Sequence, residues 1–272
     1  MIRSRNHVVM CVRQPNNEIL THREELNLVS ERHAIFKLPL LRGIVALFET
    51  LYLGIKGAFF SANAAVDDGD EFTVKELAIV TIMVLAMASF FFVVPFLLTS
   101  LLNLQGFSFA IVEATVRLAI FLAYLTLVAT WKEFKRVLQY HGAEHKTINA
   151  HESGAAMNVA SVKRFPRLHP RCGTSFIFIV LIVSILLFSI MPDLGFAARL
   201  AYRVLLIPLI GSISYELLKL SGKYQDSTLM RTLMIPGLAF QRLTTREPDD
   251  DMIEVAIRAV KEAIRMDSSR TV

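Results

Sequence analysis

Two short clusters of potential metal ligands stand out in the middle of the chain. Residues 140–146 read Tyr-His-Gly-Ala-Glu-His-Lys, and on a helix His141 and His145 would lie one turn apart on one face. Two imidazoles at that spacing can chelate one zinc ion, and the adjacent Glu144 can take a proton from water activated by the metal. The string also matches the H-x-x-E-H pattern of inverted zincins, a weak signal at five residues. Gly142 costs up to about 1 kcal/mol against alanine in a helix interior, which indicates close packing there.

The second cluster is the segment Arg-Leu-His-Pro-Arg-Cys-Gly at residues 167–173. The position of these residues relative to the predicted membrane spans supports a shared site more than their spacing in the sequence does. Both clusters and Glu216 lie near the cytoplasmic ends of predicted spans, and therefore at the same depth at the inner membrane face. We predict a metal centre in which Glu144 is the general base and the metal is a divalent ion, with zinc expected. The candidate metal ligands are His141, His145, His169, Cys172 and Glu216, with His151 as a further alternative. The competing interpretation is that these histidines only bond to backbone or lipid phosphate.

The chain is more apolar than a soluble domain. Its hydrophobic fraction is 54% and its mean hydropathy is +0.48, whereas soluble domains reach about 45–50%. No charged residue occurs between Glu76 and Glu113, and a bilayer core requires about 20 apolar residues per helix. No secretory signal is visible at the start. We predict four membrane-spanning helices, at residues 77–99, 111–131, 173–191 and 196–218.

Basic residues are confined to three segments. Residues 1–75, 132–172 and 219–272 hold 26 of the 29 lysines and arginines, whereas the loops at 100–111 and 192–194 hold none. The positive-inside rule places the three basic segments in the cytoplasm. We therefore expect a bacterial cytoplasmic (inner) membrane protein with both termini and the middle loop in the cytoplasm. The basic excess indicates contact with anionic lipid head groups rather than with a specific nucleic acid.

The regions outside the spans give weaker signals. Residues 1–35 form an N-terminal cytoplasmic segment in which alternating apolar residues flank a turn, which predicts a β-hairpin. Residues 36–65 predict an amphipathic interfacial helix, or one packed against the bundle, with a polar stripe of Arg42, Glu49 and Lys56. A fifth span is the alternative for this segment, but it would put the Arg-rich start on the wrong side of the membrane. Residues 221–272 form a C-terminal cytoplasmic segment.

This C-terminal segment predicts an amphipathic helix that begins near Asp250. Its apolar face would carry Ile253, Ile257, Val260 and Ile264. We expect the two cysteines, Cys11 and Cys172, to remain reduced in the cytoplasm, without a disulfide.

Two charged residues lie inside the second span. Glu113 and Arg117 are four residues apart, and charges at that depth pair or face the protein interior. We favour a mutual ion pair over an ion pathway.

Taken together, several stretches resemble the YqhQ-like family of bacterial multi-pass membrane proteins. The two clusters carry the resemblance, and matching stretches occur at residues 40–43, 214–216, 236–241, 244–248 and 254–256. The family is a domain of unknown function generally described as a predicted metal-dependent enzyme, so the resemblance implies the topology and a metal without defining a substrate. Family members usually begin with Gly-Gly-Gln-Ala leading to Glu-Gly-Val, and this chain is expected to start inside that stretch.

The expected fold is all-α, a polytopic transmembrane helical bundle of about four spans. The transmembrane domain covers residues 77–220 and includes the cytoplasmic loop 132–172. The leading hypothesis for function is a metal-dependent hydrolase at the cytoplasmic membrane face. One alternative is a non-enzymatic assembly or interaction factor with a membrane or cytoplasmic protein partner and structural His and Cys clusters. A second alternative is a transporter that uses Glu113 and Arg117.

Overall fold

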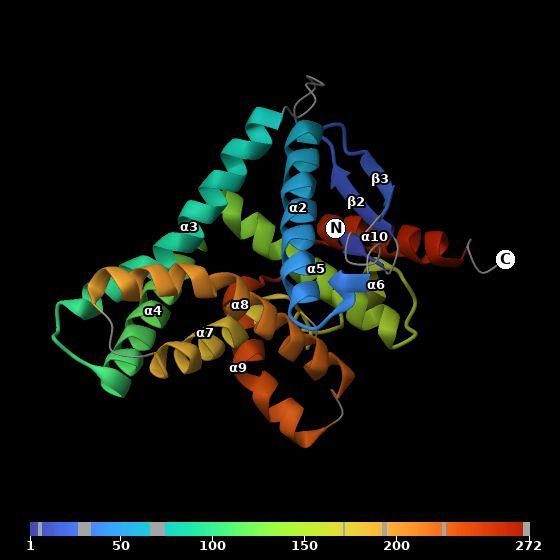
Figure 1. Cartoon of the computed structure of the whole chain (residues 1–272). Coiled ribbons are helices and arrows are strands. Elements are labelled where there is room, and N and C mark those ends of the chain that lie inside the picture. The colour runs from blue at the N-terminus through green and yellow to red at the C-terminus, as the bar shows by residue number, and fades with distance from the viewer. Residues whose placement is uncertain are drawn as a thin grey trace.

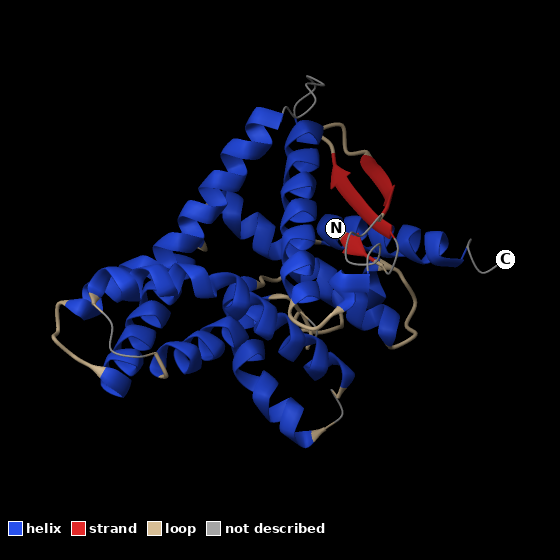
Figure 2. Cartoon of the chain, viewed as in Figure 1, coloured by secondary structure: helices blue, strands red, loops and turns tan. Residues whose placement is uncertain are grey.

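A computed structural model of the chain describes residues 1–4, 7–26, 34–65, 74–170, 172–191, 195–224 and 227–268. Helices of a bundle occupy one side of the molecule, and a small sheet with further helices occupies the other (Figure 1, Figure 2). Arg171 and the loop at 192–194 lie outside the described residues.

The N-terminal sheet has three antiparallel strands in the order β1 (Ile2–Arg3), β2 (His7–Arg13) and β3 (Ile19–Glu25). A turn between β2 and β3 contains Asn17 at φ 67°, a left-handed conformation that asparagine tolerates. The predicted hairpin is therefore confirmed, and a short first strand extends it.

Helix α10 (Asp250–Ser268) lies between this sheet and helix α5 (Lys132–Glu152). Of its predicted apolar face, Ile253, Ile257 and Val260 are buried, whereas Ile264 is exposed. Small residues of α10 pack against the sheet, and Ile253 and Ile257 pack with α5 and the short α6 (Val159–Val162). Protein rather than lipid thus covers the apolar face of α10.

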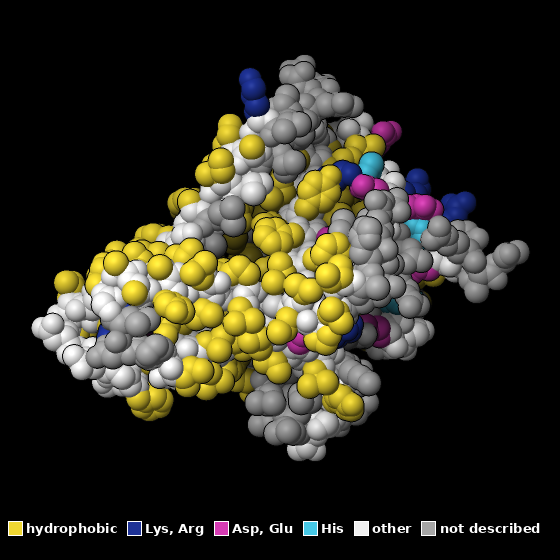
Figure 3. Space-filling view, viewed as in Figure 1, with side chains coloured by type: hydrophobic (Ala, Val, Ile, Leu, Met, Phe, Trp, Pro, Cys, Tyr) yellow, Lys and Arg dark blue, Asp and Glu magenta, His cyan; other side chains and the backbone are white. Residues whose placement is uncertain are grey.

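The bundle contains α3 (Val74–Ser100), α4 (Gly106–Val128), α7 (Thr174–Ser189), α8 (Phe196–Lys223) and α9 (Thr228–Thr244). Among the described residues, four helices are long and apolar enough to cross a membrane: α2 (Leu41–Ala65), α3, α4 and α8. Hydrophobic side chains cover the bundle on the face seen in Figure 3, and charged side chains gather over the sheet. The chain is therefore a helical membrane protein.

Helices α3, α4 and α8 match three of the predicted spans. The predicted span at 173–191 and the helix α2 differ from the prediction. The apolar stretch at 173–191 forms α7, which has 16 residues. At 1.5 Å per residue such a helix reaches roughly 24 Å, short of a hydrocarbon core of about 30 Å. By length and composition α2 also qualifies as a span.

Helix α2 (Leu41–Ala65) follows a 3-10 turn, η1 (Ala34–Lys37), and runs crosswise to α7 and α8 (Figure 1). Its predicted polar stripe makes ion pairs within the protein. Arg42 binds Glu216 of α8, and Lys56 Nζ lies 2.7 Å from both carboxylate oxygens of Glu24. The crosswise orientation of α2 fits the predicted position in the membrane interface. That position stays a prediction.

The N-terminal sheet and the C-terminal helix α10 lie on the same side of the bundle, because β2 packs against α10 (Figure 1). The loop between α3 and α4 lies at the opposite end of the bundle. Within the bundle, Glu113 pairs with Arg117 at 2.5 Å, as predicted. Arg203 of α8 also binds this carboxylate.

Candidate metal centre

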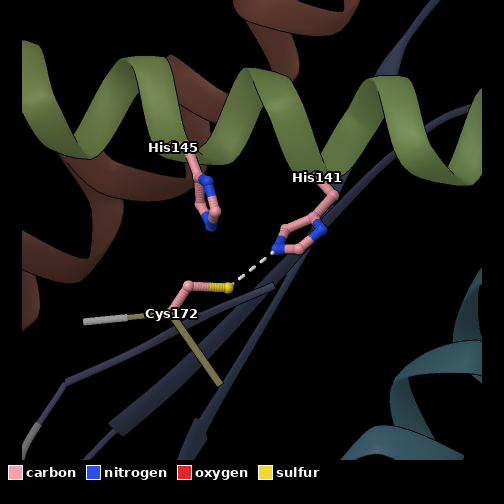
Figure 4. A group of neighbouring side chains, drawn as sticks. All are labelled: His141, His145 and Cys172. Carbon is pink, nitrogen blue, oxygen red and sulfur yellow. Dashed lines mark hydrogen bonds between the residues drawn. The ribbon is translucent and has the colours of Figure 1, made fainter. Parts of the chain in front are cut away.

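Three predicted ligands converge where α5 meets the start of α7. His141 and His145 project from one face of α5, with ring centroids 4.3 Å apart, and both point toward Cys172 (Figure 4). The Nε2 atom of His141 lies 3.2 Å from the Cys172 sulfur. One ligand atom from each residue lies within 4.8 Å of the other two. The structure thus unites the two sequence clusters.

Backbone carbonyls fix both imidazole rings. His141 Nδ1 lies 2.9 Å from the carbonyl oxygen of Thr244, and His145 Nδ1 lies 2.7 Å from that of Arg167. A carbonyl oxygen only accepts hydrogen bonds, so each Nδ1 carries a proton, and Nε2 is the ring nitrogen that can bind a metal when the ring is neutral. A hydrogen bond on the far nitrogen is the usual way in which proteins orient metal-binding histidines.

Gly142 lets the chain beyond α9 approach α5 closely. A Cβ atom at this position would lie 2.1 Å from the carbonyl oxygen of Arg246. The Arg246 amide donates to the carbonyl of Leu138 at 2.9 Å, which fastens the segment to α5. This close approach brings Thr244 beside His141 and confirms the packing reason expected for the glycine.

Buried amide side chains hold the loop that carries His169. Gln241 bridges the backbone of His169, accepting from its amide at 2.9 Å and donating to its carbonyl at 2.8 Å. Asn149 donates to the carbonyls of Pro166 and Leu168. The loop is thereby tied to both α5 and α9.

The other predicted ligands lie outside the group of three. The ring of His169 is 5.9 Å from that of His145, and its Nε2 faces Glu152 at 3.4 Å. His151 is exposed, and Glu216 is engaged by Arg42.

Glu144 lies on the side of α5 that faces a cavity of about 340 Å³. His141, Tyr140 and Cys11 also line this cavity, and most of the remaining wall is apolar. The Glu144 carboxylate is partly exposed and lies 3.9 Å from the amino group of Met1. The predicted general base therefore shares a cavity with one predicted ligand.

The electrostatic surroundings favour the charged form of His141. Burial alone would lower its pKa. The hydrogen bond with Cys172, the carbonyl of Thr244 and the nearby Glu144 carboxylate outweigh burial, so the pKa of His141 lies above its ordinary value. The same interactions would stabilise positive charge at this position in general.

The donor set fits a zinc ion. Zn–N bonds of about 2.0 Å and Zn–S bonds of about 2.3 Å place tetrahedral ligands roughly 3.3–3.6 Å apart. The 3.2 Å between His141 and Cys172 is close to this spacing, and the limit of 4.8 Å for the group requires a contraction of at most about 1.5 Å. Imidazole nitrogen and thiolate sulfur are both common zinc ligands, and catalytic zinc sites have three protein ligands.

Sequence reasoning missed the groups that orient these ligands. Gln241 and Thr244 belong to stretches that carried the family resemblance, but no role followed from them. The carbonyls of Thr244 and Arg167 have no side-chain signal, since every residue has a carbonyl. Only an alignment of related chains would have singled out Gln241, as a buried amide within an apolar helix.

Fold and site together define a multi-pass helical membrane protein with a two-histidine, one-cysteine centre at the junction of its bundle and its sheet-containing part. The chain belongs to the family described as "Protein of unknown function (DUF1385)", which matches residues 38–266. It is 33% identical over 293 residues to "Uncharacterized protein YqhQ" of Bacillus subtilis (strain 168), covering 98% of this chain and 90% of that protein. The YqhQ-like resemblance is thus confirmed. No solved structure matches the chain.

Proposed function

We propose that this protein is a metal-dependent membrane enzyme, a hydrolase whose zinc ion is bound by His141, His145 and Cys172. The supporting observation is the convergence of two carbonyl-oriented Nε2 atoms and a buried thiol from separate parts of the chain. Three protein ligands are the number found in catalytic zinc sites, whereas structural sites have four.

The surrounding residues suit hydrolysis. Zinc held by three protein ligands supplies Lewis acidity and activates water near neutral pH. Glu144 is the group that would accept a proton, because its carboxylate faces the cavity that His141 also lines. The largely apolar wall of that cavity favours a substrate with an apolar part.

The proposed location is the bacterial cytoplasmic membrane, with the metal centre at the cytoplasmic face. The three basic segments support this orientation, as does the packing of the N-terminal sheet against α10. Anionic lipid head groups are the proposed partners of the basic surface.

Metal content tests the site. Detergent-purified full-length protein, prepared without chelator, should contain about one zinc ion per chain. The double variant His141→Ala, His145→Ala should lose it, whereas the control His22→Ala, His151→Ala, which also removes two histidines, should retain it. Absence of metal from the wild type would refute the proposal.

Activity requires a second comparison. Glu144→Gln should retain the metal and lose hydrolysis of ester and amide substrates, with Glu133→Gln, an exposed carboxylate earlier on α5, as its control. Equal activity of Glu144→Gln and the wild type would remove Glu144 from catalysis.

A non-enzymatic role around a structural metal is the second candidate. The observation that favours it is the position of His169, whose ring lies 5.9 Å from that of His145. A fourth ligand from His169 would close the site. His169→Ala should then lose the metal, whereas the catalytic proposal expects the metal to stay.

A further inference from the structure

A second cluster of functional groups lies at the opposite end of the bundle. A cavity of about 470 Å³ opens there, between the first turn of α4, the last turn of α7 and the first turns of α8. Its polar lining includes Gln105, Ser189, Arg199 and Arg203. This cavity is separate from the metal centre and has no part in the proposed hydrolase activity.

Among the residues that the structure describes, the buried charges of Glu113, Arg117 and Arg203 behind this cavity do not balance. Glu113 is the acceptor for both Arg117 and Arg203, so two guanidinium groups share one carboxylate. All three side chains are buried, with exposures of 1%, 6% and 3% in that order. A net positive charge inside a membrane bundle is costly, and such residues mark functional sites.

Hydrogen-bond donors of these arginines also remain unmatched. Nε of Arg117 is buried without a hydrogen-bond partner among the described residues. Arg203 donates from Nε and Nη2 to Glu113, and its Nη1 makes no hydrogen bond to any described residue. Because Arg203 lines the cavity, an acceptor that enters the cavity can reach this group.

Aromatic rings cover the faces of the guanidinium groups. The guanidinium of Arg203 lies 4.3 Å from the ring centroid of Phe96 and 4.7 Å from that of Phe188. Arg117 lies over Phe92 at 5.0 Å and over Phe188 at 5.2 Å. These contacts orient the guanidinium planes. A ligand can therefore meet only their N–H edges, the geometry in which guanidinium binds phosphate.

A different cavity lies on the other side of the ion cluster. It has a volume of about 230 Å³, and of the described residues that line it only Arg117 and Ser184 are polar. The rest of its wall is apolar and includes Phe121, Phe178 and Leu181. An aliphatic chain suits this space, whereas a soluble anion does not.

We propose that the Glu113, Arg117 and Arg203 cluster binds an anionic lipid. Its phosphate contacts Arg203 in the larger cavity, and an aliphatic chain occupies the apolar cavity beside Arg117. The lipid belongs to the leaflet opposite the sheet-containing part of the protein. Its negative charge compensates the excess guanidinium charge, which no described side chain in the cluster does.

Native mass spectrometry of the full-length protein in detergent tests this proposal. With equal amounts of phosphatidylglycerol and zwitterionic phosphatidylcholine, the protein should retain one phosphatidylglycerol with about tenfold preference, the value of one charge-assisted hydrogen bond. Arg203→Gln should weaken this binding about tenfold, while Glu113→Gln should preserve or strengthen it. Both variants break the same ion pair, so equal losses in both would assign the cluster a purely structural role and overturn the proposal.

Two further comparisons identify the source of the phosphate. Leu181→Trp fills the apolar cavity and should weaken phosphatidylglycerol binding without changing the retention of inorganic phosphate. Glycerol phosphate that displaced the lipid at equal concentration would overturn the lipid assignment, as would equal retention of both lipids by the wild type. Thermal unfolding of each variant verifies that it is folded, so a loss of binding can be separated from a loss of structure.

Discussion

Substitution of Gly142 by alanine should disturb the metal centre through the backbone. The new Cβ would lie 2.1 Å from the carbonyl oxygen of Arg246, and Cβ contacts below 3.0 Å essentially never occur. Helix α5 and the segment after α9 must therefore separate by roughly 1 Å. Neither side is a flexible side-chain end that could rotate away.

The magnitude follows from two opposing effects. Alanine gains up to about 1 kcal/mol in helix propensity over glycine, whereas overpacking costs about 1–3 kcal/mol. The free energy of unfolding should thus fall by about 0–2 kcal/mol. The effect on metal binding should be larger, because the Thr244 carbonyl would leave His141 Nδ1, now 2.9 Å away. Loss of such a partner lowers metal affinity by about 10–100-fold.

Chelator competition measures the zinc affinity, and thermal unfolding verifies the fold. Gly54→Ala is the matched control, because a Cβ at this position in α2 would meet no atom within 4 Å. It should leave zinc affinity unchanged. If folded Gly142→Ala bound zinc as tightly as Gly54→Ala and the wild type, the close approach would have no part in building the site.

Three further predictions concern the same centre. Zinc binding should weaken as pH falls through the pKa of His141, at a higher pH than for an ordinary histidine, because protons compete for Nε2. The metal-free protein should show the opposite pH dependence in its stability. The stability that protonated His141 contributes is lost as pH rises through its pKa, and denaturant titrations at several pH values measure this loss. Gln241→Ala removes two buried hydrogen bonds and should cost about 2–4 kcal/mol in thermal or denaturant unfolding, against about 0.5 kcal/mol or less for the more exposed Gln139→Ala. Maleimide labelling of Cys172, followed by mass spectrometry, should rise when a chelator is added, whereas Cys11, whose pKa is raised by burial, should not respond. Equal labelling of Cys172 with and without chelator would contradict its role as a ligand.

Local patterns in the sequence were sufficient for much of the architecture. Long apolar stretches predicted α3, α4 and α8, because a helix that faces lipid must be apolar over its whole length. Alternation around a turn predicted the hairpin. The i, i+4 spacing placed His141 and His145 on one face, and Gly142 indicated the close contact.

The length of an apolar stretch was a less reliable guide to the length of the helix that it forms. The apolar stretch at 173–191 gives only the 16 residues of α7. The polar stripe of α2 turned out to serve ion pairs with Glu24 and Glu216. Hydropathy indicates which helix surfaces are buried away from water. It does not indicate which neighbouring residue pairs with the charged side chains of a helix.

Tertiary structure alone selected the partners in both clusters. Cys172 joined the two histidines, while Glu216 was taken by Arg42. The carbonyl of Thr244 orients one ring, and Arg203 joins an ion pair that the sequence placed on one helix. Spacing along the chain determines which side chains share a helix face, because helical geometry is local. Contacts between distant segments depend on how whole helices pack, and a backbone carbonyl leaves no trace in residue identity.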